Sequence, residues 1–424
     1  ISRQMKGSSG PSGVDADGWC RMLTSYKAAS DHLCRTLALA AQCLCTEAIP
    51  ASDVSAFTAS RLIPLAKKPS GVRPIAVGEV FRRLIGRAVM SVIKPDVLRA
   101  VAPLQLCVGV PSACEAAVHA MRKIFNRDDT EAILFVDATN AFNSLNRTAA
   151  LHNIPRICPA LGKIFQNTYS DKTRLFVAGG GEVLSQEGTC QGDPLAMAYY
   201  AVATVPLVQR LQEANPDVDQ EWYADDDAAG GDISSLASYW KDVNIIGPEY
   251  GYNPNPTKTT LLVKPQYLDR AEEVFQGTGV CVTAAGHQYL GGIIGDEDYC
   301  HRVGDRYVSN WRRELMNLTA MAEMQPQAAY TVLTKGLSSK WSYHLRASLL
   351  DPVTLAPADE VLGHQLLPAL LSQGMAADSS QRQLLSLPTR FGGLAIPMVA
   401  KSAEAEHAPF DVRVTDLGPS LLSR

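Results

Sequence analysis

A continuous apolar run that ends in a carboxylate constrains the fold of this chain more than any other feature. The run spans Ala132 to Val136, and Asp137 follows it directly. A short run without alternating polar residues is typical of a strand that is buried on both faces. The sequence therefore predicts a core strand that presents Asp137 at its C-terminal end.

A second acidic site lies far along the chain, where Asp225, Asp226 and Asp227 follow Tyr223 and Ala224. Small residues and glycines come next, which favours a tight hairpin. Neighbouring residues of a strand point to opposite faces, so a hairpin tip is needed to bring two adjacent carboxylates to one place. An isolated pair of this kind is more often two loop carboxylates than a site, so its meaning depends on the rest of the sequence.

The two acidic sites together suggest a metal centre. If Asp137, Asp225 and Asp226 meet in the fold, their repulsion raises their pKa values unless cations compensate. Magnesium prefers oxygen ligands, and in-line phosphoryl transfer uses two divalent ions about 3.5–4 Å apart. The carboxylates therefore predict a two-magnesium site, with manganese as a substitute, if the strand end and the hairpin are neighbours.

The length and composition of the chain are compatible with an enzyme, but they do not identify its ligand. With 424 residues, 46% of them hydrophobic, the chain can form two or three domains, or one enzyme of subdomains around a cleft. Its net charge of -4 excludes the overall basic surplus that is typical of nucleic-acid binders. Residues 61–99 are nevertheless strongly basic, opposed only by Glu79 and Asp96. This local charge favours a phosphate-facing surface, and the alternative is a solvated helix face.

Local patterns predict three further elements. Residues 60–64 and 72–77 read as the two strands of a hairpin around a basic turn. Asp193 and Pro194 predict a helix start, with aspartate as the N-cap and proline at the first helical position. Apolar residues recur at helical spacing in residues 81–93. In that helix the expected buried face holds Phe81, Leu84, Ile85, Ala88, Val89, Val92 and Ile93, and the opposite face holds Arg82, Arg83 and Arg87.

The cysteines and the apolar runs bear on the setting of the protein. The 10 cysteines are scattered without a Cys-x-x-Cys pair, which argues against structural zinc. No apolar run approaches the roughly 20 residues of a membrane span, so we expect no membrane partner. Scattered thiols without a secretory signal predict an intracellular protein, cytoplasmic or nuclear. The chain starts at Ile1 and not at Met, which leads us to expect a fragment of a longer protein.

Six short segments resemble, in the same order, the sequence boxes of reverse transcriptases. The nearest likeness is to polymerases of eukaryotic retroelements, particularly those without long terminal repeats. Two departures from the family pattern are Asp227, where an apolar or small residue is more usual, and Cys190, where polar residues are common. The segments are residues 64–75 (fingers), 135–143 (first metal-binding Asp), 186–195 (Gln-Gly box), 223–226 (Tyr-x-Asp-Asp), 255–259 (lysine box) and 289–292 (primer grip).

The resemblance implies an α/β polymerase shaped as a right hand. Its palm would hold a small antiparallel sheet with helices, and its thumb would be helical. The expected division is an N-terminal extension that is partly flexible (1–50), fingers (51–130), palm with fingers elements (131–295), thumb (296–350) and a C-terminal region of unknown role (351–424).

The resemblance also implies roles for the acidic and basic residues. Asp137 and Asp225 would hold both metal ions, with Asp226 as a supporting ligand. Lys258 would donate a proton to the departing pyrophosphate, although a lysine in a loop is as often merely solvated. The triphosphate would be neutralised by Arg73 and by Lys67 or Lys68.

The remaining site residues would contact the nucleotide and the primer. Phe142, with Ala138 nearby, would lie under the sugar and exclude a 2′-hydroxyl, which argues for deoxynucleotides; the alternative is a core aromatic residue. Gln191 and Gly192 would support the template and the incoming nucleotide before a helix start. The primer-grip hairpin would contain Tyr289, Leu290 and Gly291.

The predicted activity is RNA-directed DNA synthesis in a mobile retroelement. The expected partners are an RNA template, a DNA primer or RNA/DNA duplex, and deoxynucleoside triphosphates. Two alternatives remain open, an RNA-dependent RNA polymerase and an inactive relic or host-adopted nucleic-acid-binding protein. The sequence leaves the oligomeric state, template preference and priming mode undetermined.

Overall fold

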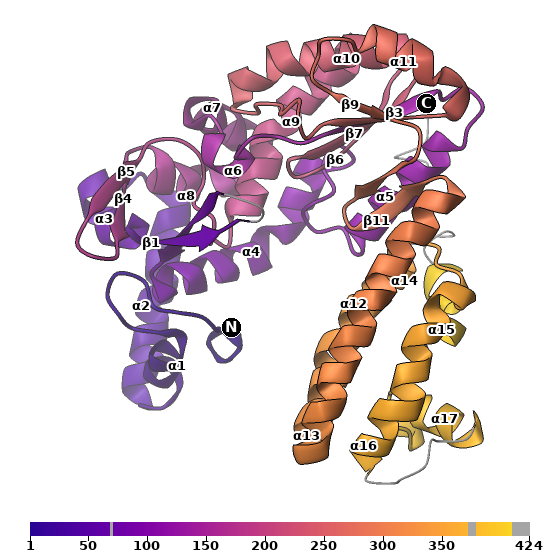
Figure 1. Ribbon diagram of the computed structural model, residues 1–424. Coiled ribbons are helices and arrows are strands. Elements are labelled where there is room, and N and C mark those ends of the chain that lie inside the picture. The colour runs from indigo at the N-terminus through magenta and orange to yellow at the C-terminus, as the bar shows by residue number, and fades with distance from the viewer. Residues whose placement is uncertain (68–70, 372–378, 409–424) are drawn as a thin grey trace. The chain divides into compact units, whose positions relative to one another are not determined.

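The computed structural model describes residues 1–67, 71–371 and 379–408, and its architecture mixes α and β elements with helices predominant (Figure 1). Lys68 and the end of the predicted C-terminal region lie outside the described residues. The chain forms two compact units. Unit 1 comprises residues 1–111, 136–229 and 234–259, and unit 2 comprises residues 112–135, 230–233 and 260–424. The predicted division into fingers, palm and thumb stays a prediction.

Unit 1 begins with helices that lead into a small sheet. The helices are α1 (Ala16–Thr24), α2 (Ala28–Thr46) and α3 (Ala51–Thr58). The strands β1 (Ser60–Ala66) and β2 (Val72–Gly78) form the predicted hairpin, with Arg61 opposite Val77. A parallel pair joins β1 to β4 (Thr173–Val177), and β4 pairs antiparallel with β5 (Glu182–Ser185).

The helix α4 (Val80–Val101) departs from its predicted faces. Val92, expected in the core, is 76% exposed, whereas Arg82, expected on the outer face, is 3% exposed. Arg82 is buried because its guanidinium finds an acid, a phenol and a carbonyl inside the unit, as described below. The predicted basic surface therefore loses Arg82, and Arg83 instead donates to the carbonyls of Lys6 and Ser8.

The rest of unit 1 packs helices around the hairpin that carries the Asp-Asp pair. The short helix α6 (Ala141–Ser144) precedes α7 (Arg147–Ile157) and α8 (Pro159–Tyr169), which pack against each other. The helix α9 (Ala196–Ala214) is buried along most of its length and packs against α4 and α7. The strands β6 (Asp219–Tyr223) and β7 (Asp226–Gly231) are neighbours in a sheet, and α10 (Ile233–Ile246) follows them.

Unit 2 is built on the predicted core strand. β3 (Ala132–Val136) is buried at every position, as its apolar run predicts. It pairs antiparallel with β8 (Thr260–Val263), but β8 pairs parallel with β9 (Cys281–Thr283), so the pairing is not purely antiparallel as expected. The helices α5 (Ala113–Phe125) and α11 (Leu268–Val274) belong to the same unit. A separate hairpin joins β10 (Gly286–Tyr289) to β11 (Gly292–Gly295).

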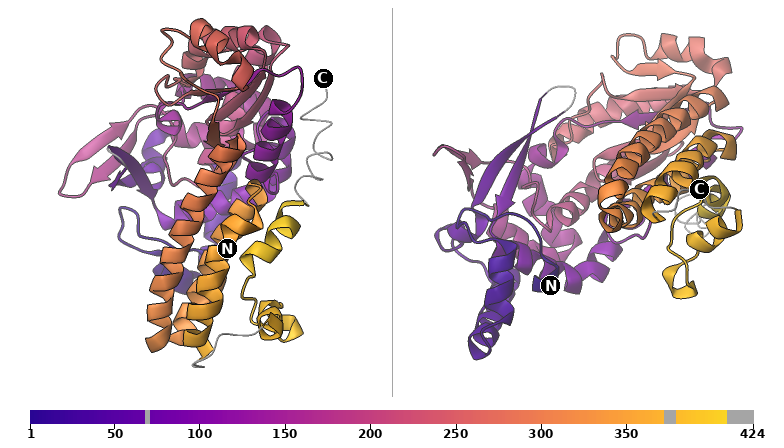
Figure 2. Two further views of the ribbon diagram at one scale, coloured as in Figure 1. Left: turned by 45° about the vertical axis from the view of Figure 1, so that its right-hand side comes forward. Right: turned by 60° about the horizontal axis from the view of Figure 1, so that its bottom comes forward.

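The C-terminal part of unit 2 is helical, as predicted for residues 296–350. The long helix α12 (Glu297–Met324) lies alongside α15 (Pro352–Val361) in every view (Figures 1 and 2). Trp311 and Trp341 are buried in the core of this helical group. None of the described helices is long and apolar enough to cross a membrane. The other helices are α13 (Pro326–Val332), α14 (Ser338–Ala347), α16 (Leu367–Leu371) and α17 (Ser379–Ser386).

Candidate catalytic site

A polar cavity of about 240 Å³ in unit 1 brings both predicted acidic sites together. Most of the residues predicted for metal, phosphate and sugar binding line it, although they come from distant parts of the sequence. Its lining consists of Lys67, Val72, Arg73, Pro74, Asp137, Ala138, Asn140, Ala141, Phe142, Asn143, Gln191, Asp225, Asp226 and Lys258. The cavity is called the carboxylate cavity below.

Asp137 enters the carboxylate cavity from a short paired segment. The carbonyl of Asp137 accepts a hydrogen bond from the backbone N–H of Asn255 at 2.7 Å, and Ala138 forms a bridge with Pro254. This pairing brings Lys258 close, and its Nζ donates to Asp137 Oδ1 at 3.2 Å. Both side chains are nearly half exposed, so the pair itself contributes about 1 kcal/mol at most.

A buried glutamine fixes the hairpin turn that carries the Asp-Asp pair. Ala224 has a φ of 57°, a left-handed conformation that is unfavourable for alanine. Gln105 Nε2 donates to the Ala224 carbonyl at 2.9 Å, and the Ala224 N–H donates to Gln105 Oε1 at 2.9 Å. Tyr252 adds a hydrogen bond from its hydroxyl to the Asp225 carbonyl at 3.2 Å. Gln105 is fully buried. No spacing in the sequence marks it, because it lies so far from the turn.

Burial and neighbouring charges raise the pKa values of two carboxylates of the cavity, Asp225 and Asp226. Burial raises the pKa of Asp225, and the charge of Asp137 raises it further, while Arg73 and Lys67 act against this rise. Burial, followed by the charges of Asp225 and Asp137, raises the pKa of Asp226 to about 7. The charges of Asp137 and Asp225 therefore both reach Asp226, as a shared site requires.

The donor set fits a hard divalent cation, but the side chains are not arranged as ligands. Carboxylate oxygens suit magnesium, and a cation would favour the ionised forms of Asp225 and Asp226, whose pKa values are raised by burial and then by neighbouring charges. Within the described residues, no group of three or more His, Cys, Asp and Glu side chains is arranged so that it could hold a metal ion. Asp137 Oδ1 instead forms an ion pair with the ammonium group of Lys258.

Asp227 does not join the pair that precedes it. Its side chain is buried, and the hydroxyl of Tyr239 on α10 lies 3.0 Å from Oδ1 and 2.9 Å from Oδ2. Burial raises the pKa of Asp227 well above its ordinary value. The departure from the family pattern is therefore accommodated in the core, away from the carboxylate cavity.

Phe142 lines the carboxylate cavity and is partly buried. Its carbonyl accepts a hydrogen bond from the N–H of Thr189 at 2.7 Å. Its ring stacks on Tyr200 of α9, with ring centroids 4.7 Å apart and an interplanar angle of 27°. Tyr200 was not among the predicted site residues.

Gln191 and Gly192 lie in a loop that is held to the neighbouring hairpin. The carbonyl of Gln191 accepts a hydrogen bond from the N–H of Ala76 on β2 at 3.2 Å. Gly192 has a φ of 120°, and a Cβ there would lie 2.7 Å from the carbonyl oxygen of Ala76. Only glycine fits this close approach of two backbones.

A buried ion pair follows this loop and corrects the predicted helix start. Asp193 Oδ2 accepts hydrogen bonds from Arg82 Nη2 at 2.7 Å and from the Tyr169 hydroxyl at 2.9 Å. Arg82 also donates to the Thr58 carbonyl at 3.0 Å. The helix α9 begins at Ala196, two residues later than predicted, because the Asp193 side chain accepts from the N–H of Leu195 in a turn instead of capping a helix.

The predicted primer-grip residues Tyr289, Leu290 and Gly291 lie in unit 2, at the turn of the β10–β11 hairpin. Leu290 has a φ of 46° and Gly291 a φ of 83°, which together close this tight turn. The Tyr343 hydroxyl donates to the Leu290 carbonyl, and the Tyr307 hydroxyl donates to the Gly291 carbonyl at 3.3 Å. The hairpin is thus fixed to the helices of its own unit.

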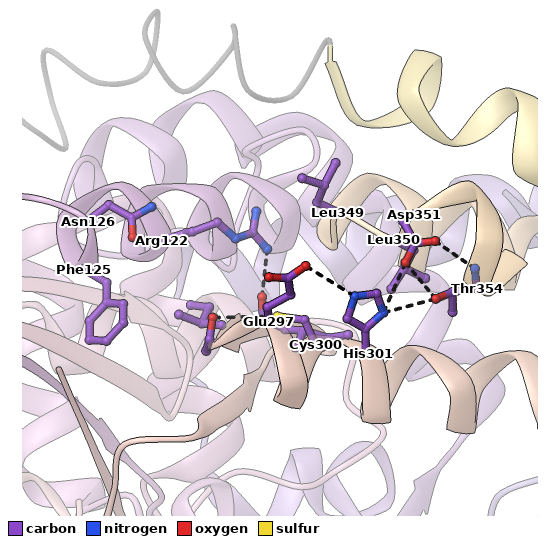
Figure 3. A pocket seen from close by; sticks show the side chains of 13 residues that line it. Arg122, Phe125, Asn126, Glu297, Cys300, His301, Leu349, Leu350, Asp351 and Thr354 are labelled. Carbon is purple, nitrogen blue, oxygen red and sulfur yellow. Dashed lines mark hydrogen bonds and ion pairs between the residues drawn. The ribbon is translucent and has the colours of Figure 1, made fainter. Parts of the chain in front are cut away.

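A second cavity, of about 390 Å³, lies in unit 2 and contains no predicted site residue (Figure 3). His301 on α12 lies between two acids there. Its Nδ1 is 3.2 Å from Asp351 Oδ2, and its Nε2 is 3.7 Å from Glu297 Oε1. The thiol of Cys300 has its pKa raised by burial, which disfavours a thiolate nucleophile.

Comparison with known proteins finds likeness only among solved structures. No protein-family model matches the chain, and no curated protein matches it significantly. An apo telomerase from Candida tropicalis, truncated from its C-terminal domain, aligns at 15% identity with a TM-score of 0.39, over 49% of this chain and 51% of that one. The chain therefore spans about half the length of this neighbour.

Two further telomerase structures align over more of the chain. Telomerase from Candida albicans, in complex with a TWJ fragment of telomeric RNA, has 10% identity and a TM-score of 0.43 over 92% of this chain and 70% of that one. Apo telomerase from Candida tropicalis has 11% identity and a TM-score of 0.44 over 88% and 68%. The function proposed below stands on the residues of the carboxylate cavity.

Proposed function

We propose that this chain is an RNA-directed DNA polymerase of a mobile element, of the kind that lacks long terminal repeats, with the fingers, palm and thumb of that fold. One observation supports the proposal above all others. Asp137 and the Asp225–Asp226 pair, which are far apart in the sequence, line one cavity together with Lys67, Arg73 and Gln191. An arrangement of acids for metal ions beside bases for phosphate suits nucleotidyl transfer.

The acids of the cavity would hold two magnesium ions. Asp137 and Asp225 would contact both ions, and Asp226 would support them. When bound, these ions would favour ionisation of the primer 3′-hydroxyl and stabilise charge on the pyrophosphate that leaves. Burial, and after it the charges of neighbouring carboxylates, raises the pKa values of Asp225 and Asp226, and a bound cation would offset this by favouring their ionised forms.

The bases of the cavity would bind the triphosphate. Arg73 offers a planar fork and Lys67 a point charge, and both lie close enough to affect Asp225. Lys258 would release Asp137 as substrate and metal enter, and would then donate a proton to the departing pyrophosphate. Its hydrogen bond to Asp137 places its ammonium at the cavity already.

The remaining parts would select the nucleotide and hold the duplex. Phe142 would exclude a 2′-hydroxyl, so that deoxynucleotides are preferred. Gln191 and Gly192 would support the template base and the incoming nucleotide. The primer would be contacted by Tyr289, Leu290 and Gly291. The helices from residue 296 to 350 would follow the duplex that the RNA template forms with the DNA primer.

Primer extension on an RNA template tests the proposal. The wild type should extend a DNA primer with deoxynucleotides in magnesium or manganese. Asp225→Ala should lose about a thousandfold in rate while still binding the duplex, because it removes charge stabilisation and not the binding surface. The control is Asp217→Ala, which removes an exposed acid from the loop before the same hairpin and should extend normally.

Three outcomes contradict the proposal in different ways. Duplex binding without extension by the wild type, in either metal, indicates an inactive relic or a binding protein. A preference for ribonucleotides indicates an RNA-dependent RNA polymerase. Full activity of Asp225→Ala removes the proposed metal site.

A further inference from the structure

The ring of Phe142 stacks on the ring of Tyr200, and separate hydrogen bonds hold the backbone around Phe142. The Thr189 N–H donates to the Phe142 carbonyl at 2.7 Å, and the Asn143 N–H closes the turn on the Asn140 carbonyl at 2.8 Å. These hydrogen bonds therefore fix the position of the Phe142 backbone, from which the side chain projects. The stacking contact with Tyr200, at 4.7 Å between ring centroids, fixes the position of the Phe142 ring.

Tyr200 is a rigid support for this ring. Its side chain is 1% exposed and is among the largest fully buried side chains of the chain's described part. It projects from α9, whose residues on either side, from Ala198 to Val202, are also buried. Close-packed surroundings of this kind leave a ring little room to move. The Tyr200 hydroxyl is buried and has no hydrogen-bond partner among the residues that the structure describes, so the ring and not the hydroxyl makes the contact.

We propose that Tyr200 is a positioning residue for nucleotide selection, which holds the Phe142 ring where it excludes a 2′-hydroxyl. This inference rests on the proposed function. Exclusion by contact works only if the excluding group cannot retreat, because discrimination is the difference between two binding free energies. Tyr200 fills the space behind Phe142, so a smaller residue there would leave a void into which the ring could withdraw.

The test compares nucleotide preference across variants of the two rings. The quantity measured is kcat/KM for a deoxynucleotide divided by kcat/KM for the matching ribonucleotide, in primer extension on an RNA template. Tyr200→Leu and Tyr200→Met remove the ring, and Tyr200→Phe keeps it. Either of the first two that folds, as judged by a thermal melt, is sufficient. Phe142→Ala removes the gate itself.

The matched control is Tyr199→Leu. Tyr199 is the neighbouring residue on α9 and is equally buried, but its ring packs against Phe165 and Tyr169. Its replacement removes the same volume from the same helix without touching Phe142. A general loosening of the core would therefore affect both variants, whereas loss of the gate would affect only Tyr200.

The expected pattern separates ring support from stability. Phe142→Ala should lower the preference for deoxynucleotides by roughly 10–200-fold, the usual size of a lost steric contact. Tyr200→Leu or Tyr200→Met should lower it by about threefold to tenfold, the usual size of an aromatic pair, while Tyr200→Phe and Tyr199→Leu keep the wild-type ratio. In the Phe142→Ala background, Tyr200→Leu should cause no further loss, because the ring it supports is gone.

The ways to overturn the inference are distinct from failure of the proposed function. If the wild type extends no primer, the proposed function fails and takes this inference with it. If the wild type prefers deoxynucleotides but Tyr200→Leu and Tyr200→Met keep that preference, only the role of Tyr200 is wrong. An equal change in Tyr199→Leu would also overturn it, because the effect would then belong to the core as a whole.

Discussion

Glu221 and Asp227 are both buried acids of the β6–β7 hairpin, yet they are treated differently by their surroundings. Asp227 accepts hydrogen bonds from Tyr239. Glu221 is 5% exposed, and its Oε1 has no hydrogen-bond partner among the described residues. Burial alone raises the pKa of Glu221 to about 8. The hairpin therefore carries an acid that favours the protonated form in the folded state.

Replacing this acid by its neutral amide should change how stability depends on pH. Below pH 4.5 the Glu221 carboxyl is protonated in both the folded and the unfolded state, so it adds no pH dependence to the free energy of unfolding. Between pH 4.5 and about 8 the carboxyl ionises in the unfolded state but keeps its proton in the folded state. The free energy of unfolding of the wild type therefore falls as pH rises through this window. Glu221→Gln should be more stable than the wild type by on the order of 4 kcal/mol at pH 8. That gain should disappear near pH 4.

Urea denaturation at a series of pH values measures this difference. The control is Glu213→Gln, which changes an exposed acid near the end of α9 and should stay within about 0.5 kcal/mol of the wild type throughout. Parallel stability profiles for Glu221→Gln and the wild type would show that Glu221 is ionised in the folded protein.

At the scale of elements, the β6–β7 turn depends on a residue from another part of unit 1. Gln105 follows α4 in the sequence, and it satisfies both backbone groups of Ala224. Ala224 has a φ of 57° at this turn, and the next residue, Asp225, lines the carboxylate cavity. The position of Asp225 thus depends on the left-handed conformation of Ala224 and on the two hydrogen bonds from Gln105 that hold Ala224, which we call the Gln105 clamp.

The clamp and the strain predict a rescue. Gln105→Leu removes two buried hydrogen bonds and should cost about 1–3 kcal/mol of stability, with a fall in kcat that exceeds any change in KM. Adding Ala224→Gly should restore part of both losses, because glycine adopts the left-handed conformation without the penalty of about 1–2 kcal/mol. Primer extension and urea denaturation of the single and double variants measure the coupling.

Ala228→Gly is the matched control for this rescue. Ala228 is a buried alanine of β7 in the same hairpin, outside the left-handed region. Glycine there should lower stability by roughly 0.5–1 kcal/mol and should not rescue Gln105→Leu. Equal rescue by both glycines, or none by Ala224→Gly, would show that the clamp does not act through the turn.

The sequence predicts those elements whose signal is local. The apolar run before Asp137 and the hairpin at residues 60–78 are confirmed because period and turn residues lie within a few positions of each other. The helical pattern wrongly placed Arg82 on the exposed face of α4. Arg82 is buried because it pairs with Asp193, which lies far away in the sequence and which no local spacing indicates. Gln105 and Tyr200 were missed for the same reason. The roles of the site residues stay predictions.

At the scale of the whole molecule, the two units are interleaved in the sequence. The chain passes from one unit to the other within β3 and again within β7, and unit 2 resumes at Thr260. Residues 112–135 of unit 2 therefore precede much of unit 1, while β8, one of the strands that pair with β3, comes only later in the chain. A single cut in the chain cannot yield two intact units.

This arrangement predicts the behaviour of a chain that ends at Thr259. Such a chain keeps β3, which is buried at all positions, but loses β8, whose residues 260–263 pair with residues 135–132. An apolar strand left with an open edge promotes association between chains. We expect the 1–259 fragment to aggregate without a cooperative thermal transition, and co-expression of residues 260–424 to restore soluble protein by supplying β8. Calorimetry and size-exclusion chromatography measure both outcomes. A soluble 1–259 fragment with its own sharp transition would mean that this part of the chain folds cooperatively without the pairing of β3 with β8.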